Sequence, residues 1–470
     1  MDYAFGAAVL VASLMAGGHA VVYKREPRSA ALWLLVILLL PAMGPVLYVF
    51  FGVNRVERRA RRMRRERGRS RGALPGETGG EAGSEAGDGP ASHFLPLART
   101  VSEVTGRPLT AGNAVMPLAG GAEAYPAMLH AIDSAQACVV LASYIFHREG
   151  IGARFVEALS RARARGVEVR VLVDDVDVRF SRSSAIKPLR RAGVTTGVFN
   201  PPLVPARLHA IHLRNHRKIL VVDGRVGFTG GMNVDSRYWG ERPFRDLHFR
   251  LEGPVVAHLA EAFADDWDFA TDERLSGAPW FAEPAPAGAA LARAIAGGPD
   301  DPAEPLRWAF VAALNAARRS VRVITPYFLP DAALVSALNA AALRGVEVDI
   351  VLPEENDVAH VKWASMHGLW QVLEGKCRVW LSPGPFDHTK LMVVDAGWTL
   401  LGSSNWDARS LRLNFELDVE CYCGELGARL ERLALERRAA ARPVTLADVN
   451  GRPFPVKLRD GVARLFSPLL

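Results

Sequence analysis

Two long hydrophobic segments lie at the start of the chain. Residues 3–23 and residues 30–53 contain no Asp, Glu, Lys or Arg, and each is near the roughly 20 residues that an α-helix needs to cross a bilayer core. The pattern predicts two transmembrane helices joined by a short loop. Pro41, Gly44 and Pro45 interrupt the second segment, so a kinked or re-entrant element is the alternative, because proline removes a helical hydrogen-bond donor.

Basic residues around these segments predict their orientation. Lys24, Arg25 and Arg28 lie between the segments, whereas ten arginines lie in residues 55–71. Because positively charged flanks stay in the cytoplasm, the chain after residue 53 is predicted to be cytoplasmic. A cleaved signal peptide is the alternative for the first segment, but the chain lacks a basic start. The arginines favour contact with anionic lipid over a simple solvated charge run.

Residues 72–92 differ in composition from the arginine-rich stretch before them and from the folded part after them. They are mostly glycine, alanine and acidic residues, a mixture that cannot bury a core and predicts a flexible linker. Residues 1–53 are therefore interpreted as membrane segments and residues 54–92 as a polybasic and then acidic linker. Folded structure is expected from near His93.

Alternating apolar strands and amphipathic helices repeat within the folded part. Residues 131–175 and residues 313–355 each run helix, apolar strand, helix, Arg-Gly-Val-Glu-Val and a second apolar strand. Such a pattern predicts parallel strands covered by helices on both faces. We expect two α/β halves, residues 93–283 and 284–470, packed face to face. The proline- and alanine-rich residues 282–302 are predicted to hold the crossover between them.

The net charge of +7 is concentrated in one place. Ten arginines and two glutamates in residues 55–71 leave eight positive charges there, so the rest of the chain is close to neutral. A folded part without net positive charge speaks against a nucleic-acid binder, although a local basic groove stays open. The four cysteines show no zinc spacing and no disulfide framework, which predicts reduced thiols.

The strongest signal is a motif that occurs twice, in residues 216–233 and 388–405. Both copies read His-x-Lys, four residues, Asp, six residues, Gly, two residues, Asn. Retention for packing is the alternative, but His, Lys and Asn are poor core formers. The repeat therefore favours a functional site, and its candidate residues are His216, Lys218, Asp223, Asn233, His388, Lys390, Asp395 and Asn405.

Strand periodicity divides the motif residues between two faces. If His216 and Lys218 lie on a strand, both side chains emerge on one face and Arg217 points away. The aspartates Asp223 and Asp395 then fall on the opposite face, where a structural role is favoured. A site with two imidazoles, two ammonium groups and two amides suits a phosphodiester, because one histidine can attack phosphorus and the other can protonate the leaving alkoxide.

A metal site and a set of plain surface charges are the alternatives at these positions. A lysine two residues from each histidine would repel zinc, so no metal and no cofactor are expected. A working histidine needs its second ring nitrogen held. Asp246 and Glu416 lie at similar distances after the two motifs and are predicted to hold the histidines, with exposed salt-bridging carboxylates as the alternative.

The paired motifs resemble those of the phospholipase D superfamily, and more narrowly those of bacterial cardiolipin synthases. The similarity also rests on flanking pieces, namely residues 51–54, 245–248, 325–328 and 467–470. The resemblance implies an α/β fold of two pseudo-symmetric phospholipase D-like αβα sandwich halves packed together, after two transmembrane helices. It also implies a multi-pass protein of the bacterial inner membrane with a cytoplasmic catalytic part. The linker in residues 55–92 looks longer than the family pattern demands.

The resemblance further implies a transfer through a phosphatidyl-histidine. One phosphatidylglycerol would donate its phosphatidyl group and lose glycerol, and a second would accept the group to give cardiolipin. His216 is assigned as nucleophile and His388 as acid and base, although twofold pseudo-symmetry permits the reverse. The partners implied are phosphatidylglycerol, other anionic phospholipids and the bilayer, with no nucleic acid.

Four other functions remain as alternatives: a phospholipase D-type hydrolase, a phosphatidylserine synthase, a nuclease of the same superfamily and a catalytically silent scaffold. The hydrophobic segments and the near-neutral folded part disfavour the nuclease. Both motifs are intact, which disfavours the scaffold. Residues 357–375 are partly amphipathic, and an ordinary packed helix is favoured there over one that touches the bilayer.

Overall fold

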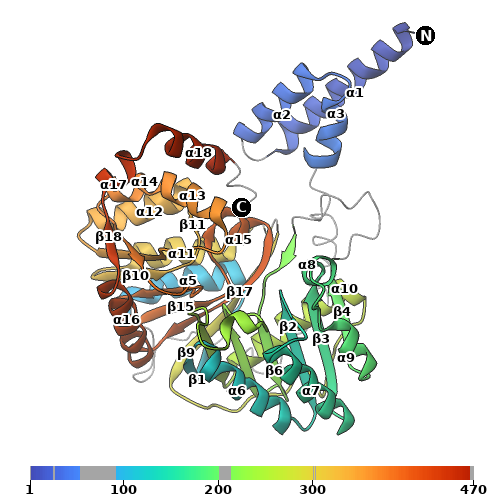
Figure 1. Cartoon of the computed structure of the whole chain (residues 1–470), viewed down its shortest axis with the longest axis vertical. Coiled ribbons are helices and arrows are strands. Elements are labelled where there is room, and N and C mark those ends of the chain that lie inside the picture. Colours follow the sequence, from blue (N-terminus) through green and yellow to red (C-terminus); the bar gives the residue numbers. More distant parts are fainter. Residues whose placement is uncertain are drawn as a thin grey trace. The chain divides into compact units, whose positions relative to one another are not determined.

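The structure is a computed structural model that describes residues 2–24, 27–52, 91–200, 213–299, 301 and 303–465. Three sequence predictions lie outside these residues: the arginine run, most of the linker, and residues 467–470. The chain forms an N-terminal helical unit and a large α/β unit (Figure 1). Each unit has its own hydrophobic contacts.

The N-terminal unit contains α1 (Asp2–Tyr23), α2 (Pro27–Leu39), α3 (Gly44–Leu47) and a π-helical turn, η1 (Tyr48–Gly52). Within the described residues, one helix is long and apolar enough to cross a membrane, over residues Ala4–Tyr23. The small core of the N-terminal unit contains Ala16, Ala20, Ile37 and Tyr48.

The second hydrophobic segment is not the single spanning helix that its length predicts. Helix α2 has 13 residues, or about 20 Å at the usual helical rise, whereas a bilayer core is roughly 30 Å thick. The helix ends before Pro41, which lacks the N–H that a continuing helix needs. The chain then turns back, so that α3 contacts both α1 and α2. The prediction of two transmembrane helices is therefore supported for the first segment only.

One mixed sheet runs through the large unit (Figure 1), and within the described residues it has 16 strands. Those from the first part of the chain are β1 (Thr110–Ala119), β2 (Cys138–Ser143), β3 (Glu168–Asp174), β4 (Thr195–Phe199), β5 (Arg214–Asn215), β6 (Ile219–Val222), β7 (Val226–Gly230) and β8 (Leu247–Glu252). Those from the second part are β9 (Ala290–Gly297), β10 (Ser320–Ile324), β12 (Glu347–Pro353), β13 (Arg378–Ser382), β14 (Leu391–Val394), β15 (Trp398–Gly402), β17 (Asn414–Tyr422) and β18 (Arg442–Val444).

Helices cover both faces of this sheet, as expected for an α/β fold. Those of the first part are α5 (Leu95–Thr105), α6 (Gly120–Ser134), α7 (Ile151–Ala164), α8 (Asp175–Phe180), α9 (Ile186–Arg191) and α10 (Val255–Thr271). Those of the second part are α11 (Pro305–Ala316), α12 (Ala332–Leu343), α13 (Ala359–Gly368), α14 (Trp370–Glu374), α15 (Ala408–Arg412), α16 (Gly424–Ala439), α17 (Leu446–Asn450) and α18 (Phe454–Leu465). A separate two-stranded sheet pairs β11 (Phe328–Leu329) with β16 (Trp406–Asp407). All four cysteines are free.

Each half contains a set of three parallel strands, which include the strands of the sequence repeat, but the sheet as a whole is mixed rather than parallel. Strands β2, β3 and β4 run parallel, as do β10, β12 and β13. The strands that follow the two His-x-Lys motifs, β6 and β14, pair antiparallel with their neighbours. Short turns connect β6 to β7 and β14 to β15, and such turns permit only antiparallel neighbours.

The two halves join edge to edge in this sheet, and the prediction of face-to-face packing is wrong. The strand order across the junction is β15, β17, β9, β1, β8 and β7. Strand β9 lies in the stretch that was predicted as a crossover, and it pairs with β17 on one side and β1 on the other. Ala292 and Ala294 of this strand are fully buried in the central core. A strand buried in this way can be rich in alanine and still form the centre of a sheet.

The first helix of the large unit packs against the second half of the chain. Phe94, Leu97 and Val101, in and just before α5, pack into the core cluster of the second half with Leu306 and Phe310 of α11. Residues 357–375 form the packed helices α13 and α14, in which Val361, Leu369 and Val372 are buried. The packed-helix interpretation of that stretch is therefore correct, and helix α18 covers part of it.

Candidate active site

Each His-x-Lys motif lies immediately before a strand and is held against the other half of the protein. The backbone N–H of His216 donates to the carbonyl of Phe415 at 2.9 Å, next to the parallel pairing of β5 with β17. The backbone N–H of His388 donates to the carbonyl of Arg245 at 2.7 Å. The sequence prediction placed both motifs on strands, but residues 216–218 and 388–390 are extended segments before β6 and β14. At these residues, backbone hydrogen bonds to the other half of the protein take the place of regular strand pairing.

The two carboxylates that the sequence singled out hold the histidines of the opposite halves. His216 Nδ1 is 3.0 Å from Glu416 Oε2, and His388 Nδ1 is 2.9 Å from Asp246 Oδ2. Both carboxylates are buried, so the alternative of exposed salt bridges does not apply. The partners are separated by 200 and 142 residues along the chain. The site is therefore composite, and each half is incomplete without the other.

Further side chains surround these two pairs, and the sequence analysis missed them. The hydroxyl of Ser403 donates to Glu416 Oε2, and Asn414 Nδ2 donates to Glu416 Oε1 at 3.0 Å. The Tyr238 hydroxyl is 3.1 Å from His388 Nδ1. Asn414 had a detectable signal, because it lies two residues before Glu416 on one strand and so shares its face. Ser403 and Tyr238 are brought in by the tertiary fold.

Each of the two lysines donates a hydrogen bond to the backbone of its own motif. Lys218 Nζ donates to the His216 carbonyl at 2.6 Å, and Lys390 Nζ donates to the His388 carbonyl at 2.7 Å. Burial lowers the pKa of Lys218 to about 7 and that of Lys390 to about 8. Each ammonium retains further donors for an anion. An incoming phosphate would raise both pKa values, because a nearby negative charge favours the ammonium form.

The two histidine–carboxylate pairs differ in protonation. Burial lowers the pKa of His216 to about 4 and that of His388 well below its usual range. Burial opposes ionisation of Glu416, but the charges of His216 and Lys218 and the Ser403 hydrogen bond give that carboxyl a lowered pKa. Burial raises the pKa of Asp246 well above its usual range despite the nearby Lys390. At neutral pH both imidazoles are therefore neutral and Glu416 is ionised, whereas the raised pKa of Asp246 favours its protonated form.

The two motif asparagines are anchored within their own halves. Asn233 Oδ1 accepts the backbone N–H of Ile145 at 3.2 Å, and Asn405 Nδ2 donates to Ser410 Oγ at 3.3 Å. Both residues are buried. The buried Asn405 Oδ1 has no hydrogen-bond partner among the described residues. Asn233 therefore fixes the loop after β2, which carries Tyr144, whose ring centroid is 5.2 Å from that of His216.

The motif aspartates bind backbone rather than the histidines. Asp223 accepts three backbone N–H groups, those of Gln136, Ala137 and Cys138, at 2.7 to 2.9 Å. Asp395 accepts the equivalent three from residues 318–320, also at 2.7 to 2.9 Å. Both aspartates have a φ of 52°, a left-handed conformation that Asp tolerates better than most residues. Each carboxylate ties the turn after the motif strand to the start of the neighbouring strand.

We expect Asp395→Ala to lower stability without removing any reacting group. Three backbone N–H groups would lose their acceptor, a loss on the order of 2 kcal/mol in the free energy of unfolding. The measurement is the thermal midpoint of the purified chain in detergent, and Asp395→Asn, which keeps one acceptor oxygen, is the milder control. Full stability of Asp395→Ala combined with complete loss of activity would instead assign the aspartate a direct part in the chemistry.

The glycine in each motif is required by close approach of the neighbouring strand. A Cβ on Gly230 would lie 2.6 Å from the Leu247 carbonyl oxygen, and one on Gly402 would lie 2.3 Å from the Leu417 carbonyl oxygen. Their φ angles are 151° and 158°. These glycines let β7 and β15 pass close to β8 and β17, the strands that begin beside Asp246 and Glu416. Each glycine thus lets the strand beside Asp246 or the strand that carries Glu416 pack closely against the hairpin of the preceding motif.

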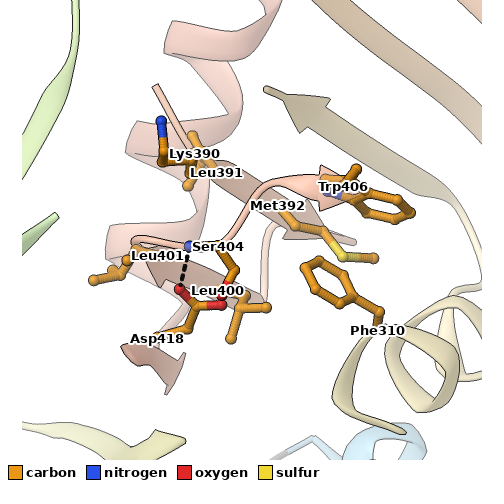
Figure 2. Close-up of a pocket in the computed structure, with 10 residues that line it drawn as sticks. Phe310, Lys390, Leu391, Met392, Leu400, Leu401, Ser404, Trp406 and Asp418 are labelled. Atoms are coloured by element: carbon orange, nitrogen blue, oxygen red, sulfur yellow. Dashed lines mark hydrogen bonds between the residues drawn. The ribbon is translucent and has the colours of Figure 1, made fainter. Parts of the chain in front are cut away.

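A small pocket lies beside the second motif (Figure 2). Its lining combines apolar side chains, among them Phe310, Met392 and Trp406, with Lys390, Ser404 and Asp418. The Ser404 N–H donates to Asp418 Oδ1 at 3.1 Å. Figure 2 shows the Lys390 ammonium pointing away from the apolar cluster. The lysine stem therefore packs on the core while its charged end faces the histidine.

Together these features fit transfer of a phosphodiester group through histidine. Two imidazoles fixed at Nδ1 leave two Nε2 atoms for phosphorus and for the leaving oxygen, and two ammonium groups neutralise the nonbridging oxygens. The charge of His216 is among the causes that lower the pKa of His388, as are both lysines. The four groups therefore act on one another within a single site. A duplicated α/β fold with one composite His/Lys site defines the phospholipase D class of proteins.

Comparison with known proteins gives the family within that class. Residues 128–267 and 310–435 match the family described as cardiolipin synthase, PLD-like domain, and residues 12–52 match the phospholipase D-nuclease N-terminal family. The chain belongs to the cardiolipin synthase family of phospholipase D-like proteins.

Relatives of this family cover nearly the whole chain. A cardiolipin synthase of Geobacillus thermodenitrificans is 32% identical over 95% of this chain and 90% of its own. The major cardiolipin synthase of Bacillus subtilis is 30% identical over 95% of both chains. The crystal structure of phosphatidylserine synthase from Haemophilus influenzae has a TM-score of 0.64 at 15% identity and covers 80% of this chain and 100% of that one. At that identity the likeness is one of fold.

Proposed function

We propose that the protein is a membrane phosphatidyltransferase that makes cardiolipin and glycerol from two molecules of phosphatidylglycerol. The observation that carries the chemistry is the pair of neutral histidines, each held at Nδ1 by a buried carboxyl group of the other half. The lipid substrate is supported by the relatives named cardiolipin synthases, which align with 95% of the chain at about the same length.

In the first step, His216 is the nucleophile. The ionised Glu416 accepts the Nδ1 proton of His216, so the lone pair of Nε2 is free to attack the phosphorus of phosphatidylglycerol. A bond forms from Nε2 to phosphorus, and the bond from phosphorus to the glycerol headgroup oxygen breaks. Protonated Asp246 donates to His388 Nδ1, which leaves the His388 proton on Nε2, where it is given to the departing glycerol. The product of this step is a phosphatidyl-histidine.

In the second step, the reaction runs in reverse with a new alcohol. His388 Nε2, now without its proton, takes one from the glycerol hydroxyl of a second phosphatidylglycerol. That oxygen attacks phosphorus, the bond to His216 Nε2 breaks, and cardiolipin is released. Lys218 and Lys390 neutralise the nonbridging oxygens in both transition states. The opposite assignment of the histidines is chemically possible, but the ionised carboxylate at His216 favours it as the nucleophile.

Hydrolysis and transfer to another alcohol are the competing functions. Water in place of the second lipid would give phosphatidic acid. Serine as the acceptor would give phosphatidylserine from the same intermediate. The histidine pair serves all of these reactions equally, because the acceptor enters only in the second step. The near-full-length similarity to cardiolipin synthases favours a lipid glycerol as the acceptor.

The product distribution tests this function directly. With vesicles of phosphatidylglycerol, the purified protein is expected to form one glycerol per cardiolipin without added nucleotide or metal ion. Mass spectrometry of the lipids together with an assay of free glycerol measures the ratio. Accumulation of phosphatidic acid with little cardiolipin would contradict the proposal and make the protein a hydrolase. Vesicles of phosphatidylcholine alone are the control, because they should give neither cardiolipin nor free glycerol.

We further propose that the protein resides in the bacterial inner membrane with its large unit in the cytoplasm. The apolar helix Ala4–Tyr23 and the match of residues 12–52 to an N-terminal family of phospholipase D-like proteins support membrane attachment. The positive flank after residue 53 supports the orientation. Attachment by one full span with a re-entrant second segment accommodates the break at Pro41.

A further inference from the structure

Helix α18 exposes a continuous apolar stripe. Phe454, Leu458, Val462 and Leu465 are 75%, 56%, 47% and 77% exposed. At the helical rotation per residue, these four side chains fall within a sector of about 80°. Isolated exposed hydrophobic residues are common on soluble proteins, but four on one face of one helix form a patch that calls for a partner.

The opposite face of α18 is fixed to the large unit. Ala463 is buried against Val361 and Ala364 of α13, and Figure 1 shows α18 lying across α13. Asp460 is buried and paired with Arg452 and Arg459. The apolar stripe is therefore held facing outward by contacts on the other side of the helix. A rotation that buried the stripe would break these ion pairs.

Cationic residues flank the stripe on both sides. By the same rotation of about 100° per residue, Lys457 and Arg464 lie beside one edge and Arg459 beside the other. Arg459 lies over the ring of Trp363, with 4.4 Å from its guanidinium carbon to the ring centroid. The helix carries these three cations and one carboxylate, the paired Asp460. An apolar face bordered by basic residues is the pattern of a helix that lies in the interface of an anionic bilayer.

The layer that α18 covers reaches the second histidine. The cluster beneath α18 includes Leu329, and Tyr327 packs against it. The ring centroid of Tyr327 lies 6.2 Å from that of His388, and its hydroxyl donates to Asp357 at 2.7 Å. A membrane bound at α18 would therefore be separated from His388 by the packed side chains that include Leu329 and Tyr327.

We propose that α18 docks the large unit on an anionic membrane surface, with its apolar stripe in the headgroup region and its cations on anionic headgroups. The proposal goes beyond the phosphatidyltransferase function, because it assigns a second membrane contact to a helix that carries no reacting group. The cations beside the stripe favour an anionic lipid surface over other groups that could cover the stripe. The apolar helices of the N-terminal unit or a second copy would satisfy the stripe, but they would gain little from the flanking cations.

The test uses the full chain reconstituted in vesicles, with a spin label at Leu458→Cys in a Cys423→Ser background. Leu343, an exposed leucine of α12 at 63%, supplies the matched control label. Vesicles contain phosphatidylcholine with or without sulfoquinovosyl diacylglycerol, an anionic lipid without a phosphodiester, so that the added anion is not itself a substrate. We expect the label at 458 to lose roughly fivefold in accessibility to a water-soluble nickel chelate when the anionic lipid is present. The label at 343 should not change.

Two outcomes overturn the proposal. A label at 458 that stays open to the chelate in both vesicles means that the stripe faces water. A label that is shielded equally in both vesicles and in detergent means that the N-terminal helices or a second copy cover it. As an independent measurement, Leu458→Glu should raise the KM for phosphatidylglycerol in mixed vesicles about tenfold with little change in kcat, because acid among anionic lipids weakens docking. Leu343→Glu is its control, and neither label measurement depends on which lipid is made.

Discussion

His216→Ala is expected to reduce cardiolipin formation by at least about 10⁴-fold, because the atom that bonds to phosphorus is removed and water is a poor substitute. No phosphatidyl-enzyme should then accumulate from any donor. The intermediate can be measured by acid quenching and mass spectrometry of the intact chain. His130→Ala, which removes an exposed imidazole of α6, is the matched control and should retain full activity.

The corresponding change at His388 separates the two histidine roles. His388→Ala removes only the proton donor, so a phosphatidyl donor with an acidic leaving group, such as nitrophenol, should still form the intermediate. With phosphatidylglycerol, whose glycerol leaves as a strong base, the same variant should be almost inactive. If His388→Ala failed with the activated donor while His216→Ala still trapped the intermediate, the two assignments would have to be exchanged.

Glu416→Gln is expected to slow formation of the phosphatidyl-histidine by about 10² to 10³-fold. The carboxylate accepts the Nδ1 proton of His216, whereas an amide can present an N–H to Nδ1 and force the proton onto the attacking Nε2. The loss should be similar with activated and natural donors, because it acts on the nucleophile. Glu425→Gln, an exposed position at the start of α16, is the matched control.

The pH profile distinguishes this effect from simple protonation of His216. The charge of Glu416 raises the pKa of His216 against the effect of burial, so removing that charge moves this pKa further below about 4. The imidazole then stays unprotonated across neutral pH, and the loss in Glu416→Gln should be independent of pH there. A variant that recovered at higher pH would show that Glu416 acts only by setting the charge of His216.

Asp246→Ala, which leaves His388 Nδ1 without its partner, tests the exchange of partners between the halves. Asp246 follows the first motif in sequence but holds His388 of the second, so its replacement should impair release of glycerol and spare the activated donor. Glu416→Gln should instead impair the natural and the activated donor alike, although Glu416 follows the second motif. If each substitution instead impaired the histidine of its own half, the cross-half contacts of 2.9 and 3.0 Å would not be the functional ones.

Several parts of this protein followed from sequence because they depend on local order. The spacing His216-x-Lys218 and its copy at 388 and 390 indicated the candidate reacting groups, since imidazole and ammonium groups are rarely buried in a hydrophobic core without a partner. Strand alternation separated Asp223 and Asp395 from the histidines. The repeated helix and strand pattern gave two α/β halves. Each of these inferences requires only residues close together in the chain.

Tertiary structure alone decided how the halves combine. The pairing of His216 with Glu416 spans 200 residues, and it depends on the register of β5 against β17, which no local spacing encodes. The same holds for β9, whose alanine-rich sequence resembles a linker until burial between β17 and β1 makes it a strand. The sequence by itself determined which groups are the candidates for the reaction, whereas the edge-to-edge sheet determined which carboxylate holds which histidine, because hydrogen-bond pairing between distant strands sets those distances.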